Sequence, residues 1–262
     1  MRILLALLVA IGLVGHAAAQ PFAWPDGRKA AVVLTYDDAL ASQRDIVLPQ
    51  LDAAGLKGTF FLPGSGIRPD DIGLWRAAAA EGHELGNHTL FHPCARGRYA
   101  MPVQYNTESY SIQTMLAEIK LMNTMLTAID GKAKHAFAVP CGDTKTGDGD
   151  YVEPLHESGI VGYMRDLYWP KGDDRGGIDL NKAQSVWFPE TATGAEMIDA
   201  VKRTEASGGL LVFGFHGVGG DYLKVSAEAH GQLVDYLAKH RSTVWVGTFS
   251  TVIDYVMTRK AK

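Results

Sequence analysis

The feature that most constrains the fold is an alternation between short apolar runs and longer amphipathic stretches. The apolar runs are rich in β-branched or aromatic residues and are bounded by Gly, Pro or polar residues, which predicts strands. They are AAVVLTY (30–36), GTFFLP (58–63), HELGNH (83–88), HAFAVP (135–140), GIVGYM (159–164), GLLVFGF (209–215) and TVWVGTF (243–249). The helical patterns between them cover 45–55, 70–82, 107–131, 194–209 and 226–240.

This alternation predicts an α/β protein with a parallel sheet and helices outside it. Seven or so strand units favour a barrel or a barrel-like closure. Such folds carry their active residues on loops at the C-terminal ends of the strands. The apolar residues of 107–131 recur every three or four residues, so we interpret them as core packing; they are Ile112, Met115, Leu116, Ile119, Met122, Met125, Leu126 and Ile129.

The N-terminus has the pattern of an export signal. Arg2 precedes an apolar run over 3–14, and three alanines at 17–19 resemble a cleavage site. The run is shorter than the roughly 20 residues of a spanning helix, which argues against the alternative of an uncleaved anchor. We expect a signal peptide at 1–19, a single domain at 20–262, a periplasmic or secreted location, and no stable membrane insertion of the mature chain.

Composition excludes some partners. The formal net charge is −4, and removal of Arg2 with the signal makes it −5. A chain with this balance lacks the basic footprint expected of nucleic-acid binding and the polybasic patch expected at anionic lipid. The composition leaves the oligomeric state open.

The strand at 30–36 runs directly into two adjacent carboxylates, Asp37 and Asp38. Adjacent strand residues point to opposite faces, so the two acids have different environments. Two buried like charges repel unless a cation or a shared proton relieves them. A metal ion would let one acid ligate while the other stays free as a base; the alternative is a helix cap beside a surface acid.

Two further histidine patterns favour the metal. His88 and His92 follow the strand at 83–88, and on a helix or tight turn this spacing places both imidazoles on one side. Two His and one Asp leave an open position for water on Zn²⁺, as in catalytic zinc sites. His216 directly follows the run at 209–215, either as a third metal ligand or as a partly buried histidine hydrogen-bonded to backbone.

The segments TYDD, HTLFH and LLVFGFHG, in this order, resemble the motifs of polysaccharide deacetylases, the carbohydrate esterase family 4 proteins with a NodB homology domain. The resemblance extends from about Ala30 to Phe249 and implies a distorted (β/α)7 barrel. It also implies that Asp37 is the general base that activates water. Asp38, His88 and His92 would hold a divalent metal, most often zinc, with cobalt or nickel also accepted. His216 would be the general acid.

Two motifs depart from the family pattern. The third resembles Arg-x-Pro-Tyr-Gly, but the chain reads AVPCG, with Ala138 in place of the arginine and Cys141 in place of the tyrosine. The backbone N–H of Cys141 can still stabilise the oxyanion. The missing arginine normally orients the base, and Arg165 is the candidate replacement.

The fourth motif resembles Asp-Trp-x-x-Pro and reads DLYWP here, with Asp166 at the acidic position. The resemblance implies that Asp166 hydrogen-bonds His216 and raises its pKa; the alternative is a helix-starting or surface aspartate. Cys94 and Cys141 lie on loops that we expect on the same face. They could form a disulfide between these loops or remain two buried thiols.

The sequence therefore predicts a metal-dependent hydrolase that removes acetyl groups from a carbohydrate. The resemblance favours an amide on N-acetylglucosamine units, because that activity is the more frequent one in the family. The alternatives are an O-acetyl esterase acting on xylan-like glycans and a carbohydrate-binding protein with a degenerate site. The lost arginine and tyrosine motivate the second alternative.

Overall fold

The computed structural model describes residues 22–166, 174–175, 178–180 and 184–259. The predicted signal segment 1–19 and positions 167–170 of the DLYWP motif lie outside these residues. The main sheet consists of β1 (Ala30–Asp37), β2 (Thr59–Leu62), β3 (Glu84–Asn87), β4 (Phe137–Ala138), β7 (Met164–Arg165), β10 (Ser185–Trp187), β11 (Leu210–Phe215) and β12 (Val244–Val246). Two short hairpins are formed by β5 (Lys145–Thr146) with β6 (Gly149–Asp150) and by β8 (Asp174–Arg175) with β9 (Ile178–Asp179).

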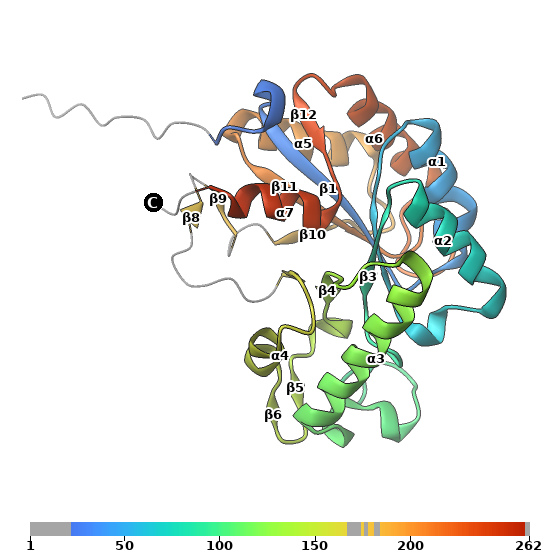
Figure 1. Ribbon diagram of the computed structural model, residues 1–262. Helices are drawn as coiled ribbons and strands as arrows, with labels where there is room; N and C mark the ends of the chain where they lie inside the picture. The colour runs from blue at the N-terminus through green and yellow to red at the C-terminus, as the bar shows by residue number, and fades with distance from the viewer. Residues whose placement is uncertain (1–21, 167–173, 176–177, 181–183, 260–262) are drawn as a thin grey trace, which may run out of the picture.

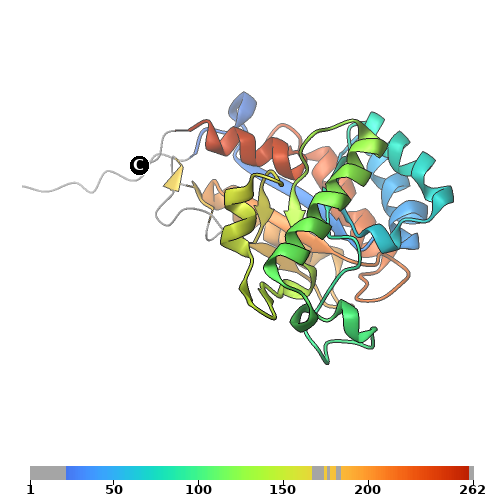
Figure 2. The ribbon, with the colours of Figure 1, turned by 60° about the horizontal axis from the view of Figure 1, so that its bottom comes forward.

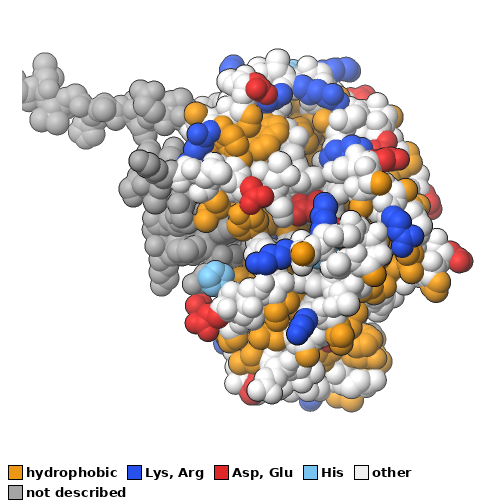
Figure 3. Space-filling view, viewed as in Figure 1, with side chains coloured by type: hydrophobic (Ala, Val, Ile, Leu, Met, Phe, Trp, Pro, Cys, Tyr) orange, Lys and Arg blue, Asp and Glu red, His pale blue; other side chains and the backbone are white. Residues whose placement is uncertain are grey.

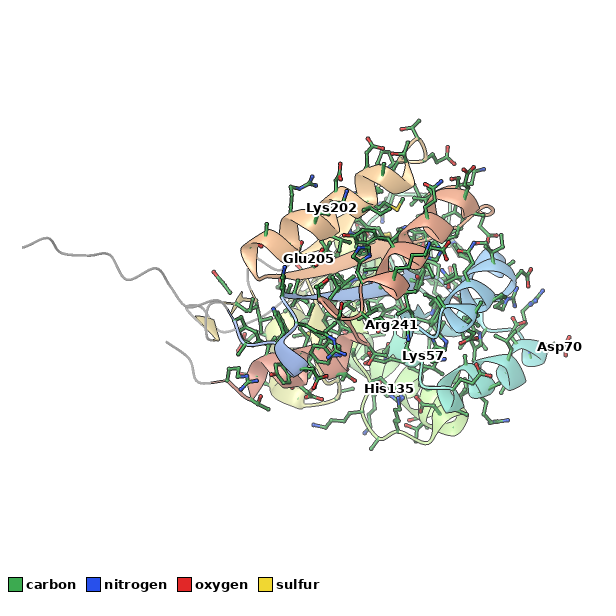
Figure 4. The ribbon with its side chains drawn as sticks, turned by 90° about the horizontal axis from the view of Figure 1, so that it is seen from above. Lys57, Asp70, His135, Lys202, Glu205 and Arg241 are labelled. Carbon is green, nitrogen blue, oxygen red and sulfur yellow. A yellow bond between two sulfur atoms is a disulfide. The ribbon has the colours of Figure 1, made fainter. Side chains whose placement is uncertain are left out.

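Helices surround this sheet (Figure 1). They are α1 (Leu48–Ala53), α2 (Ile72–Ala80), α3 (Ile112–Asp130), α4 (Val152–Ser158), α5 (Gly194–Ser207), α6 (Ala227–Lys239) and α7 (Phe249–Met257). Figure 2 shows α3 crossing the front of the molecule. In the view from above, Lys202 and Glu205 mark α5 (Figure 4), and Tyr236 of α6 donates a hydrogen bond to Glu205 (3.3 Å). Within the described residues, no helix has the length and apolar character needed to cross a membrane.

The strand order is β10-β11-β1-β2-β3-β4-β7, every neighbouring pair is parallel, and β12 also pairs with β1. The two ends of this strand order, β10 and β7, are in contact with each other. The Ser185 backbone N–H on β10 donates to Asp166, which follows β7, and the Arg165 guanidinium lies 5.2 Å from the centre of the Trp187 ring. The sheet therefore curves into a distorted barrel, which confirms the predicted α/β architecture.

The period of two along β1 divides its side chains between two sides of the sheet. Val32, Leu34 and Tyr36 join the core under α1, α5 and α6, whereas Ala31 and Val33 join a second core around α7. Phe61 of β2, Ala138 of β4 and Val212 of β11 belong to this second core as well. Because several strands contribute to it, α7 fills one end of the barrel. The alternation places Thr35 and Asp37 on the same side as Ala31 and Val33, toward the barrel interior.

All seven predicted apolar runs contain a strand, but several bounds differ. Of GIVGYM, only Met164 enters a strand, because α4 ends at Ser158 and its left-handed C-cap, Gly159 (φ 62°), is the first residue of the segment. The 107–131 helix begins at Ile112, after Ser111 caps it by accepting the Thr114 N–H (3.1 Å). Five residues of the predicted stripe are buried, as expected, and the other three, Ile112, Leu116 and Met125, are partly buried against the core. The sequence patterns did not predict β10, α4 or α7.

Candidate active site

A cavity of about 1370 Å³ opens at the C-terminal ends of the strands. Basic and acidic side chains are interspersed over the face of the molecule in Figure 3. The cavity brings together every site residue expected from the sequence, with Arg165 among them: Asp37, Asp38, His88, His92, Cys141, Arg165, Asp166 and His216.

The two adjacent acids reach the same cavity because the chain turns sharply after β1. Asp37 is the last residue of β1 and faces the barrel interior. Asp38 has a left-handed backbone (φ 83°), which a non-glycine residue rarely adopts, and its N–H donates to the Phe61 carbonyl (3.1 Å). Gln43 fixes this corner by donating to the Asp37 and His216 carbonyls. Backbone strain of this kind is typical of functional sites.

His88 and His92 lie on a tight turn after β3. Two left-handed residues, Thr89 (φ 65°) and His92 (φ 54°), bend the chain so that both imidazoles face the same point. Asn87 Oδ1 accepts the Thr89 N–H (2.8 Å), and Glu118 Oε1 of α3 accepts two more backbone N–H groups of the turn (3.0 and 2.9 Å). Glu118 was not predicted as a site residue from the sequence, because it lies within a helix interpreted only as core.

Three side-chain atoms converge at this turn. Asp38 Oδ1 lies 3.4 Å from His88 Nε2 and 3.2 Å from His92 Nε2, and the two Nε2 atoms lie 3.2 Å apart. A tetrahedral cation with ligand bonds of about 2.0–2.1 Å requires ligand atoms roughly 3.3 Å apart. Asp38 Oδ1 is buried without a hydrogen-bond donor, as expected of an oxygen directed at a cation. The three residues therefore fit a divalent metal such as zinc.

The electrostatics of this cluster also favour a positive charge. Burial alone would raise the pKa of Asp38, but its contacts with His88 and His92 hold that pKa far below the ordinary value. Burial would lower the pKa of His88, yet the carboxylates of Asp37 and Asp38 raise it above the ordinary value. The two acids thus stabilise a cation at the imidazoles.

Arg165, the candidate replacement for the missing third-motif arginine, reaches Asp37. Its guanidinium donates to Asp37 Oδ1 (2.7 Å), Asp37 Oδ2 (2.6 Å) and Thr35 Oγ1 (2.9 Å), and it lies over the Phe61 ring at 4.7 Å. Arg165 is the residue of β7 paired with Ala138 of β4, so the arginine comes from the neighbouring strand. Burial would raise the pKa of Asp37, but Arg165 and His88 bring it below its ordinary value.

His216 lies where expected, but the contact expected from Asp166 is wrong. The Asp166 carboxylate instead accepts hydrogen bonds from the backbone N–H and hydroxyl of Ser185. His216 Nε2 lies 3.7 Å from Asp38 Oδ2, and the His216 ring lies 4.8 Å from the Trp187 ring. Burial lowers the pKa of His216 below its ordinary value, although Asp37 and Asp38 oppose the shift. A left-handed Asp166 (φ 62°) turns its carboxylate toward β10.

Cys94 and Cys141 form a disulfide with Cα atoms 5.8 Å apart, as one of the two sequence hypotheses predicted. The bond joins the histidine turn to the loop after β4. Cys141 itself has a left-handed backbone (φ 56°) and lines the cavity. Two tyrosines that the sequence patterns did not single out, Tyr99 and Tyr222, also line the cavity and contact His92 and Asp38.

Comparison with known proteins shows a family for part of the chain. Residues 25–153 match the family model of polysaccharide deacetylase. These residues belong to the polysaccharide deacetylase family. A curated relative, a gellan lyase from Bacillus sp., is 32% identical over 105 residues, which are 40% of this chain and 4% of that protein's length. The chain thus resembles a small part of that protein.

Solved structures share the fold at low identity. A family 4 acetyl xylan esterase from Clostridium thermocellum in complex with a cobalt ion matches at TM-score 0.55 and 20% identity, covering 86% of this chain and 91% of that one. The catalytic domain of a peptidoglycan N-acetylglucosamine deacetylase from Eubacterium rectale matches at 0.55 and 20%, covering 88% and 92%. A carbohydrate esterase family 4 pseudoenzyme from Bacillus anthracis matches at 0.54 and 18%, covering 87% and 66%. Active and inactive proteins thus share this fold, so function depends on the site.

Proposed function

We propose that this protein is a metal-dependent hydrolase that removes acetyl groups from a carbohydrate containing N-acetylglucosamine. The observation that carries the proposal is the convergence of Asp38 Oδ1, His88 Nε2 and His92 Nε2 beside the buried Asp37–Arg165 pair. Asp38, His88 and His92 would hold the cation, with zinc as the first choice and cobalt or nickel as substitutes. A cation held by these residues would supply Lewis acidity toward an acetyl carbonyl and would lower the pKa of a nearby water.

The residues around the cation then divide the proton transfers. Asp37 accepts a proton from water as the water oxygen attacks the acetyl carbonyl carbon, and Arg165 holds both Asp37 oxygens in place. The Cys141 N–H donates to the carbonyl oxygen as negative charge develops there. The bond from carbon to the sugar nitrogen breaks, and His216 delivers a proton to the departing amine. The products are acetate and a free amino sugar.

The same residues serve an ester, so substrate choice requires a direct assay. The purified protein, freed of metal and reloaded with Zn²⁺ or Co²⁺, is incubated with chitooligosaccharides, peptidoglycan fragments and acetylated xylan, and released acetate is measured. We expect acetate from the N-acetylated glycans. Release from xylan alone would instead establish an O-acetyl esterase. No release from any glycan despite bound metal would favour a carbohydrate-binding protein with a degenerate site, the reading that Ala138 and Cys141 motivate.

We also propose that the protein is exported to the periplasm or the medium. The support is the signal-like pattern at 1–19 together with the Cys94–Cys141 disulfide, since such bonds persist in oxidising compartments. The N-terminal sequence of the protein recovered from fractionated cells tests this. A start near Gln20 in an exported fraction is expected, and an intact start in the cytosol would contradict it.

A further inference from the structure

Each candidate metal ligand has a second polar atom that points away from the cation position, and each of these atoms has a partner. His88 Nδ1 lies 2.8 Å from the Ala138 carbonyl oxygen, which can only accept a hydrogen bond. His92 Nδ1 lies 2.7 Å from the Tyr99 hydroxyl, and Asp38 Oδ2 lies 2.9 Å from the Tyr222 hydroxyl. Two of the three ligands are therefore held by tyrosine side chains from separate loops.

The protons around Tyr99 can be assigned from the two contacts of its hydroxyl with His92. The Tyr99 hydroxyl donates its one hydrogen to the His92 carbonyl (3.0 Å), so it must accept from His92 Nδ1–H. A neutral imidazole that carries its proton on Nδ1 has a free lone pair on Nε2. That Nε2 is the atom that faces Asp38 Oδ1 and His88 Nε2. Tyr99 therefore selects the tautomer of His92 that can ligate a cation.

Tyr222 has a comparable effect on Asp38. By donating to Oδ2, it leaves Oδ1 as the oxygen without a donor, directed at the two imidazoles. The loop that carries Tyr222 is held by its own backbone: Gly217 N–H donates to the Tyr222 carbonyl (3.2 Å), and Val225 N–H donates to the Gly217 carbonyl (3.1 Å). Tyr222 is thus fixed against Asp38 by the fold of its loop.

We propose that Tyr99 and Tyr222 are positioning residues that set the ligand atoms of His92 and Asp38 before the cation binds. This inference rests on the cation site of the proposed function. Both side chains are half exposed, at 46% and 53%, so they contribute less to the core than to the cavity they line. Partners of this kind fix the orientation and tautomer of metal ligands, and their loss typically weakens metal binding about 10- to 100-fold.

The test uses Tyr99→Phe, Tyr222→Phe and the double variant, each of which removes a hydroxyl and keeps the ring. Tyr105→Phe is the matched control, because Tyr105 lines the same cavity and stacks on Phe91 with ring centres 4.7 Å apart. The zinc dissociation constant of each metal-free protein is measured by competition with a chromophoric chelator. The visible spectrum of the cobalt-loaded proteins reports the ligand geometry, and thermal unfolding of the metal-free proteins reports their stability.

We expect each single variant to bind zinc about 10-fold more weakly or worse, with an altered cobalt spectrum and an unchanged melting temperature. The Tyr105→Phe control should match the wild type in all three. Wild-type zinc affinity and an unchanged cobalt spectrum in both single variants would overturn the inference while leaving the proposed function intact. If the wild-type protein binds no zinc or cobalt, the proposed function fails and the inference fails with it.

Discussion

Replacing Arg165 with Met tests whether the buried Asp37–Arg165 pair holds the catalytic centre together. The two side chains are 4% and 5% exposed, and the guanidinium makes three hydrogen bonds of 2.6–2.9 Å to Asp37 and Thr35. Removing one partner of a buried pair leaves an uncompensated charge, which costs about 3–5 kcal/mol. We therefore expect the free energy of unfolding of Arg165→Met, measured with urea, to fall by about that amount.

A double-mutant cycle separates this electrostatic cost from lost packing. Asp37→Asn alone leaves the buried guanidinium without its anion, whereas the double variant Asp37→Asn, Arg165→Met leaves neither charge. The sum of the two single losses in free energy of unfolding should therefore exceed the loss of the double variant by about 2–3 kcal/mol. Arg165→Lys is the charge-retaining control. It cannot reproduce the paired N–H contacts, so its free energy of unfolding should lie between those of the wild type and Arg165→Met. If the two single costs sum to the cost of the double variant within about 0.5 kcal/mol, the reasoning is refuted.

The remaining predictions concern the disulfide, a buried histidine and the base. The Cys94–Cys141 bond spans 47 residues, and loop-closure entropy then gives about 4 kcal/mol, so the Cys94→Ser, Cys141→Ser double variant should unfold at clearly lower urea; an unchanged midpoint would contradict this. Burial lowers the pKa of His230 to about 3, so the unfolded chain binds the extra proton between about pH 3 and 6.5, and stability rises with pH across that window. The contribution of this group to the free energy of unfolding, measured with urea, should be about 2 kcal/mol lower at pH 5 than at pH 7.5, and His230→Asn should remove this difference. The same pH dependence of stability in both proteins would disprove the prediction. Asp37→Asn should abolish acetate release and keep the metal by elemental analysis, and loss of the metal instead would mean that the two acids have exchanged roles.

Much of the site was predictable because it lies at strand ends. The apolar run of β1 ends in Asp37 and that of β11 is followed by His216, and parallel strands place such ends at one edge of the sheet. The spacing of His88 and His92 was informative for the same reason. Local patterns of this kind record which residues end a strand.

The rest depends on register and on backbone turns that local patterns do not record. Arg165 reaches Asp37 only because β7 pairs with β4 and the row of strands curves until its ends meet. The contact of Asp166 with Ser185 follows from the same curvature and from a left-handed residue without a glycine to signal it. Tyr99 lies in a loop without apolar periodicity, so its contact with His92 could not be inferred from spacing.

The most direct test of the central claim is the position of the metal in crystals of the zinc-loaded protein, located from anomalous scattering at the zinc absorption edge. The account predicts one strong peak within about 2.0–2.2 Å of Asp38 Oδ1, His88 Nε2 and His92 Nε2. An anomalous zinc peak at another position, or the absence of a peak among these three atoms at saturating zinc, would contradict the account.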